Sequence, residues 1–556
     1  MKIGIRGWEV ATLLLGGIVS FFAAGFFHHV YPSLWGFILL TILLNILCAY
    51  FFELVKARMV ALWKVQEMIG LLVLAAGVVF LGLTMQLLSH YPQLFLRELF
   101  FLEPSRIPAF LGLTMAAKAG MVFLFQKQGE SRWRESRFAA WLSQNLPGLF
   151  LASAIAAATF ALATTFSHPE FIYSDNYFDT DPGDWMNRLT ANLDDVTVMR
   201  PVHPLAFLIF RPPVWLFSLA LNGNTFYAAL LFNSMLGGAC IFLAWKFFNQ
   251  RTSNSTYALL IAGLLGLSNS HLILSVFLES YMFSAAALIV FLLLLQREEK
   301  TPARLAPAGL LSFGITMTNF IQTCILFFVS TPRIKAIVHY VLIVLLLAVS
   351  LAFVQDALYP SSDPFYLPSS YSQEENYRCD LFKAQPHSVS GRANAMARSM
   401  LMFSLVAPQP LILLEETGCN FPCSMVYYFD KGGTYHISSY AGFGRALVFA
   451  WLIMLAPAGW FFLQKFYNSP KAFALSMALL LNLLFNFTLH MNYGDDFMLY
   501  SPDWTYALVF FFGISYEGLS EKKWAQFILL IFLTGLMLNN LNLFREILKA
   551  VAPFYG

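Results

Sequence analysis

The stretch SVFLESYMFSAAALIVFLLLL (residues 275–295) decides the fold, because no charged residue follows Glu279 in it. A helix of about 20 apolar residues crosses a hydrocarbon core of about 30 Å. Similar runs recur along most of the 556-residue chain, which is 58% hydrophobic and 12% charged, whereas soluble domains carry about 25% charged residues. The sequence therefore predicts an integral membrane protein in a lipid bilayer.

Thirteen transmembrane helices are predicted, which makes the chain an all-α polytopic bundle. Their apolar runs lie near residues 8–27, 34–54, 65–88, 108–125, 147–166, 225–247, 256–273, 280–296, 336–355, 443–463, 471–489, 504–517 and 524–544. A further apolar segment, 307–331, is interrupted at Thr316-Met317-Thr318-Asn319, and we interpret it as a pair of half-helices. A helix broken at membrane depth needs protein or water to satisfy its freed backbone groups.

The basic residues of the short connectors predict the topology. Lys and Arg are enriched in cytoplasmic loops, and in this chain they gather in the connectors 56–64, 126–137, 246–251, 296–304, 332–335, 464–471 and 520–523. One threading places all of these in the cytoplasm, provided that VHPLAFLIFRPPVWLFSLAL (202–221) lies along the outer interface. If this run crosses the membrane instead, every later loop inverts.

This threading places the polar stretches 167–224, 356–442 and 490–503 on the extracytoplasmic side, together with LESY (278–281). We therefore expect outer loops with interfacial helices and a site that faces the periplasm or exterior, in a protein of the bacterial inner membrane. The long loop 356–442 is expected either to cover this site or bind an acceptor, or to be a purely structural lid.

Two parts of the chain are distinguished by their polar residues. Residues 1–137 hold four predicted spans and no catalytic-looking carboxylates, which suits a packing or dimerisation module. Alternatively, LGLTMAAKAGMVFLFQKQ (111–128) distantly resembles the GtrA-like small flippase proteins that handle lipid-linked sugars. Residues 138–556 form the predicted catalytic core.

The cysteines fit the same topology. Cys379, Cys419 and Cys423 lie in the long outer loop, where an oxidising compartment would allow one disulfide among the three. The pairing cannot be deduced from the sequence, and the spacing of Cys419 and Cys423 is only a weak zinc signal.

Four carboxylates stand close together in FIYSDNYFDTDPGDWMNR (171–188): Asp175, Asp179, Asp181 and Asp184. Charges near a membrane are costly and therefore need a reason. Asp184 is expected to cap the helix that follows, whereas Asp179 and Asp181 are candidates for chemistry. Other polar or ionisable side chains are expected at the same depth, namely Arg200, His203, Glu279, His490, Tyr493, Asp495, Asp496 and Tyr500.

These residue types suit a transfer reaction. A partly desolvated carboxylate can act as a general base on a hydroxyl, and a second one can orient substrate. Asp179, Asp181 and Glu279 are candidate ligands of a divalent cation, Mg²⁺ or Mn²⁺, because hard cations prefer oxygen. The residues expected to bind a phosphate leaving group or substrate are Arg200, His203, His490, Tyr493 and Tyr500. Glu279 is also placed to cap the span that it precedes.

The order of four short motifs over residues 147–544 resembles the GT-C superfamily of polytopic glycosyltransferases, and bacterial members of unassigned substrate in particular. The motifs read FDTD (178–181), RPVHPL (200–205), LESY (278–281) and HMNYGDDFMLYSPDW (490–504). Leu278 departs from the proline of the family pattern, and Asp503 stands in the place of a histidine.

The resemblance implies a GT-C-like core and an inverting hexosyl- or pentosyltransferase. Its donor would be a polyprenyl-phosphate-linked sugar and its acceptor a hydroxyl of a glycan, lipid or protein. The matching position of the catalytic base is Asp181, with Asp179 as the second choice.

Two other hypotheses remain open. A transporter or flippase of lipid-linked sugars would use the broken segment 307–331 to coordinate ions or substrate, although the charges gather in outer loops rather than in the middle of spans. A polysaccharide ligase or polymerase would share the donor chemistry. Nucleic acid is not expected as a partner, because the net charge is only +3 and the basic residues form no patch.

Overall fold

The computed structural model describes residues 4–48, 68–128, 137–168, 172, 176–296, 301–379, 386–413, 422–429, 435–494 and 496–555. It is about 78% helical. Within these ranges seven helices are long and apolar enough to cross a membrane, or eight if one bent pair forms a single span, and five shorter apolar helices accompany them. The all-α, membrane-type class is thereby confirmed, while the number of 13 spans stays a prediction.

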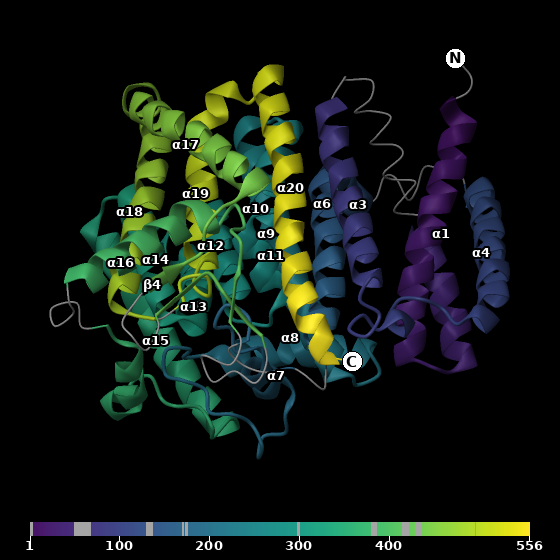
Figure 1. Ribbon diagram of the computed structural model, residues 1–556, viewed down its shortest axis with the longest axis horizontal. Helices are drawn as coiled ribbons and strands as arrows, with labels where there is room; N and C mark the ends of the chain where they lie inside the picture. The colour runs from purple at the N-terminus through teal and green to yellow at the C-terminus, as the bar shows by residue number, and fades with distance from the viewer. Residues whose placement is uncertain are drawn as a thin grey trace.

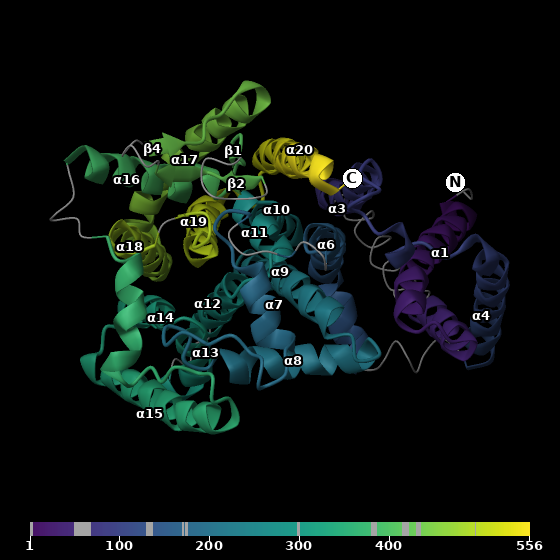
Figure 2. The same cartoon turned by 60° about the horizontal axis from the view of Figure 1, so that its bottom comes forward.

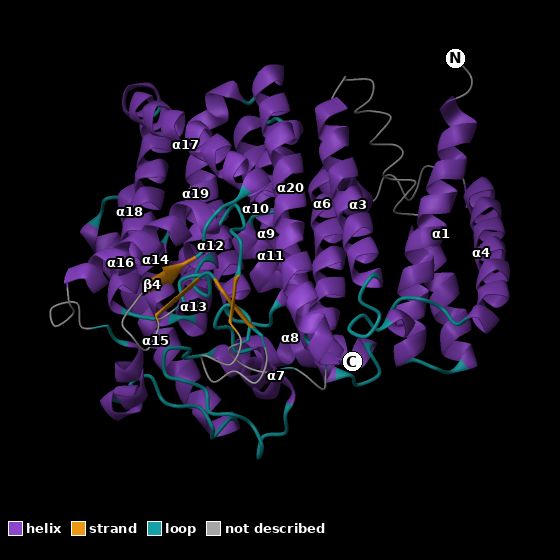
Figure 3. Cartoon of the chain, in the orientation of Figure 1, coloured by secondary structure: helices purple, strands orange, loops and turns teal. Residues whose placement is uncertain are grey.

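Helices account for nearly all of the regular structure. In chain order they are α1 (Gly4–Val30), a helix at Leu34–Cys48, α3 (Met68–Ser89), α4 (Ile107–Gln128), α6 (Arg137–Phe166), α7 (Pro182–Thr190), α8 (Ala206–Ala220), α9 (Thr225–Thr252), α10 (Ser255–Gly266), α11 (Asn269–Val276), α12 (Tyr281–Leu295), α13 (Pro302–Ile315), α14 (Met317–Ser330), α15 (Ile334–Leu358), α16 (Pro386–Arg398), α17 (Gly442–Asn468), α18 (Pro470–Asn492), α19 (Pro502–Ser515) and α20 (Lys523–Val551). Among the described residues the strands are short and form two antiparallel pairs, β1 (Leu411–Leu413) with β2 (Cys423–Met425) and β3 (Tyr427–Phe429) with β4 (Tyr435–Ile437) (Figure 3).

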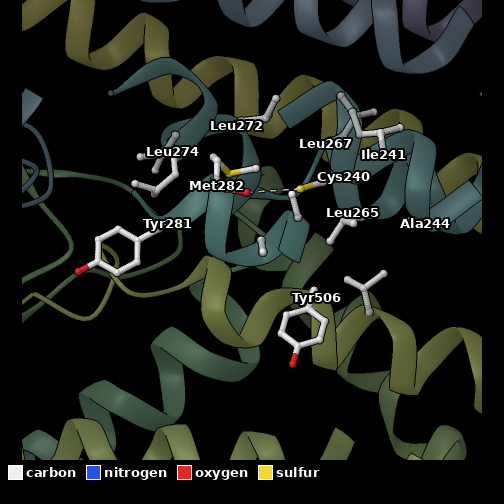
Figure 4. Packing of buried hydrophobic residues seen from close by; sticks show 14 of the residues in the cluster. Cys240, Ile241, Ala244, Leu265, Leu267, Leu272, Leu274, Tyr281, Met282 and Tyr506 are labelled. Atoms are coloured by element: carbon white, nitrogen blue, oxygen red, sulfur yellow. Dashed lines mark hydrogen bonds between the residues drawn. The ribbon is translucent and has the colours of Figure 1, made fainter. Parts of the chain in front are cut away.

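The long helices α3, α6, α18 and α20 run in roughly the same direction in Figure 1, with α7 and α8 toward the lower end of the bundle in this view. The core lies around α10 and α19, since every residue of α19 and every residue of α10 except Ser255 is buried. Figure 4 shows part of this core, where the Cys240 thiol of α9 donates a hydrogen bond of 3.7 Å to the carbonyl of Met282 on α12. Helices this apolar on all sides suit the interior of a membrane bundle.

Helix α8 packs against α7, α9 and α13, and it lies beside α7 in both views (Figures 1 and 2). Its 15 residues give it a length of about 22 Å, which is less than a hydrocarbon core. Trp215, Leu216 and Leu219 are exposed along one side. This arrangement fits the predicted position of residues 202–221 along an interface.

The segment 307–331 is broken where the sequence predicted it to be. Helix α13 ends at Ile315, Thr316 is extended and α14 begins at Met317. The backbone groups freed at the break pair with the first outer loop: Leu205 N donates to Gly314 O at 2.8 Å, and Met317 N donates to Val202 O at 3.1 Å. The loop therefore stabilises the break, as a helix interruption in a bilayer requires.

The span predicted over 256–273 is also broken, which the sequence did not reveal. Helices α10 and α11 meet at an angle of 60°. Asn269 N donates to Leu405 O at 3.0 Å, and Asn540 Nδ2 donates to Leu267 O at 2.8 Å. Distant segments supply the hydrogen-bond partners of the backbone groups at the bend, so the local sequence gives little sign of it.

The two ends of the bundle carry different groups. At one end, Glu517 accepts hydrogen bonds from Arg251 at 2.5 Å and from Lys465 at 2.7 Å, so basic connectors from different parts of the chain meet there. The first outer loop, the long loop and the start of α12 meet at the other end. Which end faces the cytoplasm stays a prediction.

The N-terminal helices form a small core of their own and also contact the main bundle. Ala24, Phe37, Leu102 and Phe110 form a small core of their own, and α1 and α4 stand beside the main bundle (Figure 1). Helix α3, by contrast, packs against α6 and α10 of the main bundle. Phe26 of α1 also contacts Phe160 of α6, with ring centroids 5.3 Å apart. The division of the chain at residue 137 stays a prediction.

Candidate active site at the acidic end of the bundle

The candidate site begins with a tight turn in the first outer loop. Phe178 and Asp179 have φ angles of 57° and 58°, and Thr180 N donates to Tyr177 O at 3.1 Å. Two successive positive φ angles with this hydrogen bond are the pattern of a type I′ turn, which usually holds Asn and Gly. A buried phenylalanine in this conformation costs about 1–3 kcal/mol, and such strain gathers at functional sites.

The long outer loop holds this turn in place. Phe178 N donates to Ser424 O at 2.7 Å, and Ser424 N donates to Asn176 O at 2.8 Å. Ser424 belongs to β2, whose first residue, Cys423, is disulfide-bonded. Of the other two candidates for this disulfide, Cys379 takes no part in one and Cys419 lies outside the described residues.

Asp181 and Glu279 meet directly after the turn. The backbone N–H of Asp181 donates a hydrogen bond of 2.8 Å to Glu279 Oε1, and Ser280 N donates to Glu279 Oε2 at 3.1 Å. Glu279 is only 5% exposed. Burial and then the charge of Asp181 raise the pKa of Glu279 to about 8. Glu279 thus fixes the acidic turn beside the start of α12, whose cap residue is Ser280 and which has no side-chain cap hydrogen bond. Its catalytic and metal-binding roles stay predictions.

Asp184 does not cap the helix, contrary to expectation. Helix α7 begins at Pro182, so Asp181 occupies the cap position, without a hydrogen bond from its side chain to the helix. Asp184 lies in the first helical turn, where its carboxylate is 3.7 Å from Arg188. Proline is favoured at the first helical position, so the helix starts at Pro182, two residues before Asp184.

Arg188 is a component of the site that the sequence did not single out. Its side chain is 7% exposed, its Nε donates to Val198 O at 3.3 Å, and its guanidinium lies 5.3 Å from the Trp185 ring. It lies close enough to Glu279 to lower the carboxyl's pKa, against the larger effects that raise it. The sequence does place Arg188 four residues after Asp184, the spacing at which opposite charges pair on a helix.

Arg200 is bound by a carboxylate of the long loop. Its Nε and Nη2 donate to the two oxygens of Glu374 at 2.8 and 2.5 Å, and Nη2 also donates to Tyr493 Oη at 2.8 Å. The Tyr493 hydroxyl donates to Glu374 Oε2 at 2.6 Å. Burial opposes charge on both partners, yet this bidentate pair lowers the pKa of Glu374 and raises that of Arg200.

Glu374 is 174 residues from Arg200, and nothing local in the sequence marks it as the partner. Because it takes two parallel N–H donors of Arg200, much of the predicted phosphate-binding capacity of that guanidinium is already used.

His203 is placed at the break between α13 and α14. Its Nδ1 is 2.6 Å from Ile315 O, and its ring lies edge-on to Trp185 at 5.4 Å. Burial, reinforced by the charge of Arg200, lowers the pKa of His203 to about 3. It is therefore uncharged at neutral pH and acts through hydrogen bonding rather than as a cation.

His490 and Tyr500 stack at the end of α18, with ring centroids 4.3 Å apart. Tyr500 in turn meets Tyr281, the first residue of α12, edge-on at 5.5 Å. These contacts connect the late motif to the Glu279 segment.

Arg392, a third residue that the sequence did not single out, terminates α18. Its Nη2 donates to His490 O at 2.7 Å and also to Gly494 O. A cation at a helix C-terminus satisfies carbonyls that have no partner in the helix. The long outer loop thus fixes the helix end that carries His490.

The four predicted motifs therefore meet at one end of the bundle, through the hydrogen bond between Asp181 and Glu279 and the one between Arg200 and Tyr493. Asp175 and Asp495 lie outside the described residues. Within the described ranges no group of three or more His, Cys, Asp or Glu side chains is arranged to hold a metal ion. Asp496 is buried and accepts a hydrogen bond from Met498 N at 2.6 Å.

No family model, curated protein or solved structure matches the chain. The fold and the site thus define a helical, membrane-type protein with a buried acidic and arginine-containing centre at one end.

Proposed function

We propose that the chain is an integral membrane glycosyltransferase of the GT-C type, with Asp181 as the general base. It would move a sugar from a polyprenyl-phosphate donor to a hydroxyl acceptor on the extracytoplasmic face. The observation that carries the proposal is the 2.8 Å hydrogen bond from Asp181 N to Glu279, which brings two motifs of the resemblance together at the end of a membrane bundle.

The proposed step is a single displacement. The acceptor oxygen forms a bond to the anomeric carbon while the bond from that carbon to the phosphate oxygen breaks, and the configuration inverts. The hydroxyl proton passes to the Asp181 carboxylate, and the electron pair leaves with polyprenyl phosphate. Glu279 positions the backbone at Asp181, so that the carboxylate is held in place to accept the proton.

Arg188 supports the phosphate role better than Arg200 does. Arg200 donates two N–H groups to Glu374. Arg188 donates from Nε to Val198 O and lies 3.7 Å from the Asp184 carboxylate. These contacts leave N–H donors of the Arg188 guanidinium for an anion. A planar guanidinium suits phosphate oxygens, and a buried one stabilises the charge that develops on a leaving group. A divalent cation remains part of the proposal, to be tested by chelation.

A transporter or flippase is the second candidate function. The break at Thr316 favours it, because discontinuous helices form substrate sites in many transporters. Against it, the first outer loop already satisfies the backbone at this break.

The two functions are separated by incubating the purified chain in detergent with a panel of polyprenyl-phosphate sugars and candidate acceptors. A transferase releases polyprenyl phosphate, and Arg188→Ala should slow this release by about 10²-fold or more if the guanidinium stabilises the leaving group. Addition of EDTA tests the cation. Absence of release with every donor, together with donor movement across vesicles, would favour the transporter.

A further inference from the structure

A ring of polar side chains lies inside the bundle, away from the acidic turn. It is formed by Asn319 and Gln322 of α14, Asn482 and Asn486 of α18, and Asp503 and Tyr506 of α19. Each is at most 3% exposed. The (i, i+3) or (i, i+4) spacing within each helix places each pair on one face. Buried polar groups in a membrane bundle are costly, and they mark functional sites by default.

The hydrogen bonds of the ring form a chain that ends on a carboxylate. Asn482 Nδ2 donates to the Tyr506 hydroxyl at 3.0 Å, and Tyr506 donates to Gln322 Oε1 at 2.9 Å. Gln322 Nε2 then donates to Asn319 Oδ1 at 2.7 Å, and Asn319 Nδ2 donates to Asp503 Oδ1 at 2.9 Å. Successive donors thus point toward Asp503, and such chains polarise one another.

Asn486 closes the ring through the backbone. Its Nδ2 donates to Asn482 O at 2.9 Å and to Asp503 O at 3.4 Å. Polar side chains therefore hold the three helices together at this level.

Among the described residues, one oxygen of the ring has no hydrogen-bond partner, and the carboxylate of the ring receives a single hydrogen bond. Asn482 Oδ1 is fully buried and has no hydrogen-bond partner within the described ranges. The Asp503 carboxylate receives one hydrogen bond, from Asn319, and forms no ion pair with any described basic side chain. Both groups are acceptors, so the missing partner is a cation or a donor.

We propose that this ring binds one monovalent cation, a proton or a sodium ion, with the Asp503 carboxylate supplying the charge. A buried carboxylate without a counter-charge is strongly destabilised unless it takes up a positive charge. Carboxylate and amide oxygens are ligands that hard cations accept. Asn319 stands three residues after the break at Thr316, the kind of place where membrane proteins bind ions.

The other described titratable groups around Asp503 are two tyrosines and a histidine, and none of them is a lysine or arginine that would supply a counter-charge. Tyr281 of α12 and Tyr506 of its own helix lie within electrostatic reach of its carboxylate. His490 of α18 lies edge-on to the neighbouring Trp504 at 5.4 Å. The proposal stands whether or not the protein is a glycosyltransferase.

The test uses the full chain, purified in detergent, and its melting temperature. Sodium chloride is exchanged for choline chloride at constant ionic strength in one series, and pH is varied without sodium in another. Wild-type protein and Asp503→Asn are compared, with Asp194→Asn in an exposed loop as the control. Asparagine keeps an oxygen that can accept the Asn319 hydrogen bond but cannot supply the charge.

For a sodium site, the melting temperature rises with each tenfold increase in sodium above Kd, in wild type and in Asp194→Asn but not in Asp503→Asn. For a proton site, sodium has no effect, and the melting temperature falls with rising pH more steeply in wild type than in Asp503→Asn. If Asp503→Asn does not fold, Asn482→Leu replaces it and should weaken the same response. Identical sodium and pH responses in wild type and variant would overturn the proposal.

Discussion

The backbone N–H of Asp181 donates a hydrogen bond of 2.8 Å to the buried carboxylate of Glu279, 98 residues further along the chain. This contact fixes a strained turn of the first outer loop on the start of α12. An unpaired buried N–H costs about 1–3 kcal/mol, so the position of Asp181 depends on Glu279. Variants of this contact and of those that surround it have distinct expected effects.

Glu279→Gln should flatten the pH dependence of stability. The pKa of Glu279, raised to about 8 in the fold, exceeds its ordinary value of 4.5. The folded state then binds the proton more tightly than the unfolded chain, so the stability present below about pH 4.5 is lost as pH rises through about 8. Melting curves from pH 5 to 9 should fall less for Glu279→Gln than for wild type. Parallel curves would show that this carboxyl does not titrate in the expected window, and the exposed Glu375→Gln serves as control.

Glu374→Ala should destabilise the protein, because it leaves the Arg200 guanidinium partly buried without its bidentate partner. A hydrogen-bonded ion pair of this kind contributes about 1–3 kcal/mol, and these side chains are only 24% and 10% exposed. A lower melting temperature is expected for Glu374→Ala, and little change for the exposed neighbour Glu375→Ala. Equal effects of the two variants would mean that the pair adds nothing specific.

Gly494→Ala should displace Tyr500 from its stack on His490. Gly494 has a φ of 82°, and a methyl group there would lie 2.6 Å from the Tyr500 hydroxyl oxygen. Both effects are unfavourable, and left-handed backbone alone costs about 1–2 kcal/mol for a non-glycine residue. The melting temperature should fall, whereas Gly459→Ala in α17, with open space around the new methyl group, should leave it unchanged or raise it. A Gly494→Ala protein as stable as Gly459→Ala would refute the geometry of this turn.

Reduction of the disulfide at Cys423 should loosen the acidic turn. Cys423 begins the strand whose Ser424 pairs with Asn176 and Phe178. Disulfides typically contribute about 2–4 kcal/mol. Cys423→Ser should therefore lower the melting temperature and increase proteolysis within residues 176–181, while Cys240→Ser in the core should leave proteolysis of that turn unchanged. Unaltered cleavage in Cys423→Ser would show that the turn does not depend on the disulfide.

The sequence predicted features that arise from local composition. The polar interruption at Thr316–Asn319 marked a helix break, and α8 within residues 202–221 is short, as the predicted position along the interface requires. Both are consequences of helix propensity and of the cost of charge in lipid.

Features that depend on distant partners could not be predicted in this way. Arg200 looked available for phosphate because its partner, Glu374, lies in an unpatterned stretch of the long loop. The 60° bend before Asn269 depends on Asn540, far along the chain, and the sequence around it is apolar enough for one helix. Local propensity is a weak guide wherever tertiary contacts decide.

The central claim, that Asp181 is the base of a glycosyl transfer, is tested most directly by comparing Asp181→Asn with Asp179→Asn. The pair is matched, since each variant removes one carboxylate of the same turn, and asparagine tolerates the left-handed conformation at position 179. The rate of polyprenyl phosphate release is measured with a donor that the wild-type protein turns over, and the melting temperature checks folding. We predict that Asp181→Asn lowers the rate by about 10²–10⁴-fold, the usual contribution of a general base, while Asp179→Asn stays within about tenfold of wild type. Full activity of a folded Asp181→Asn protein would contradict the account.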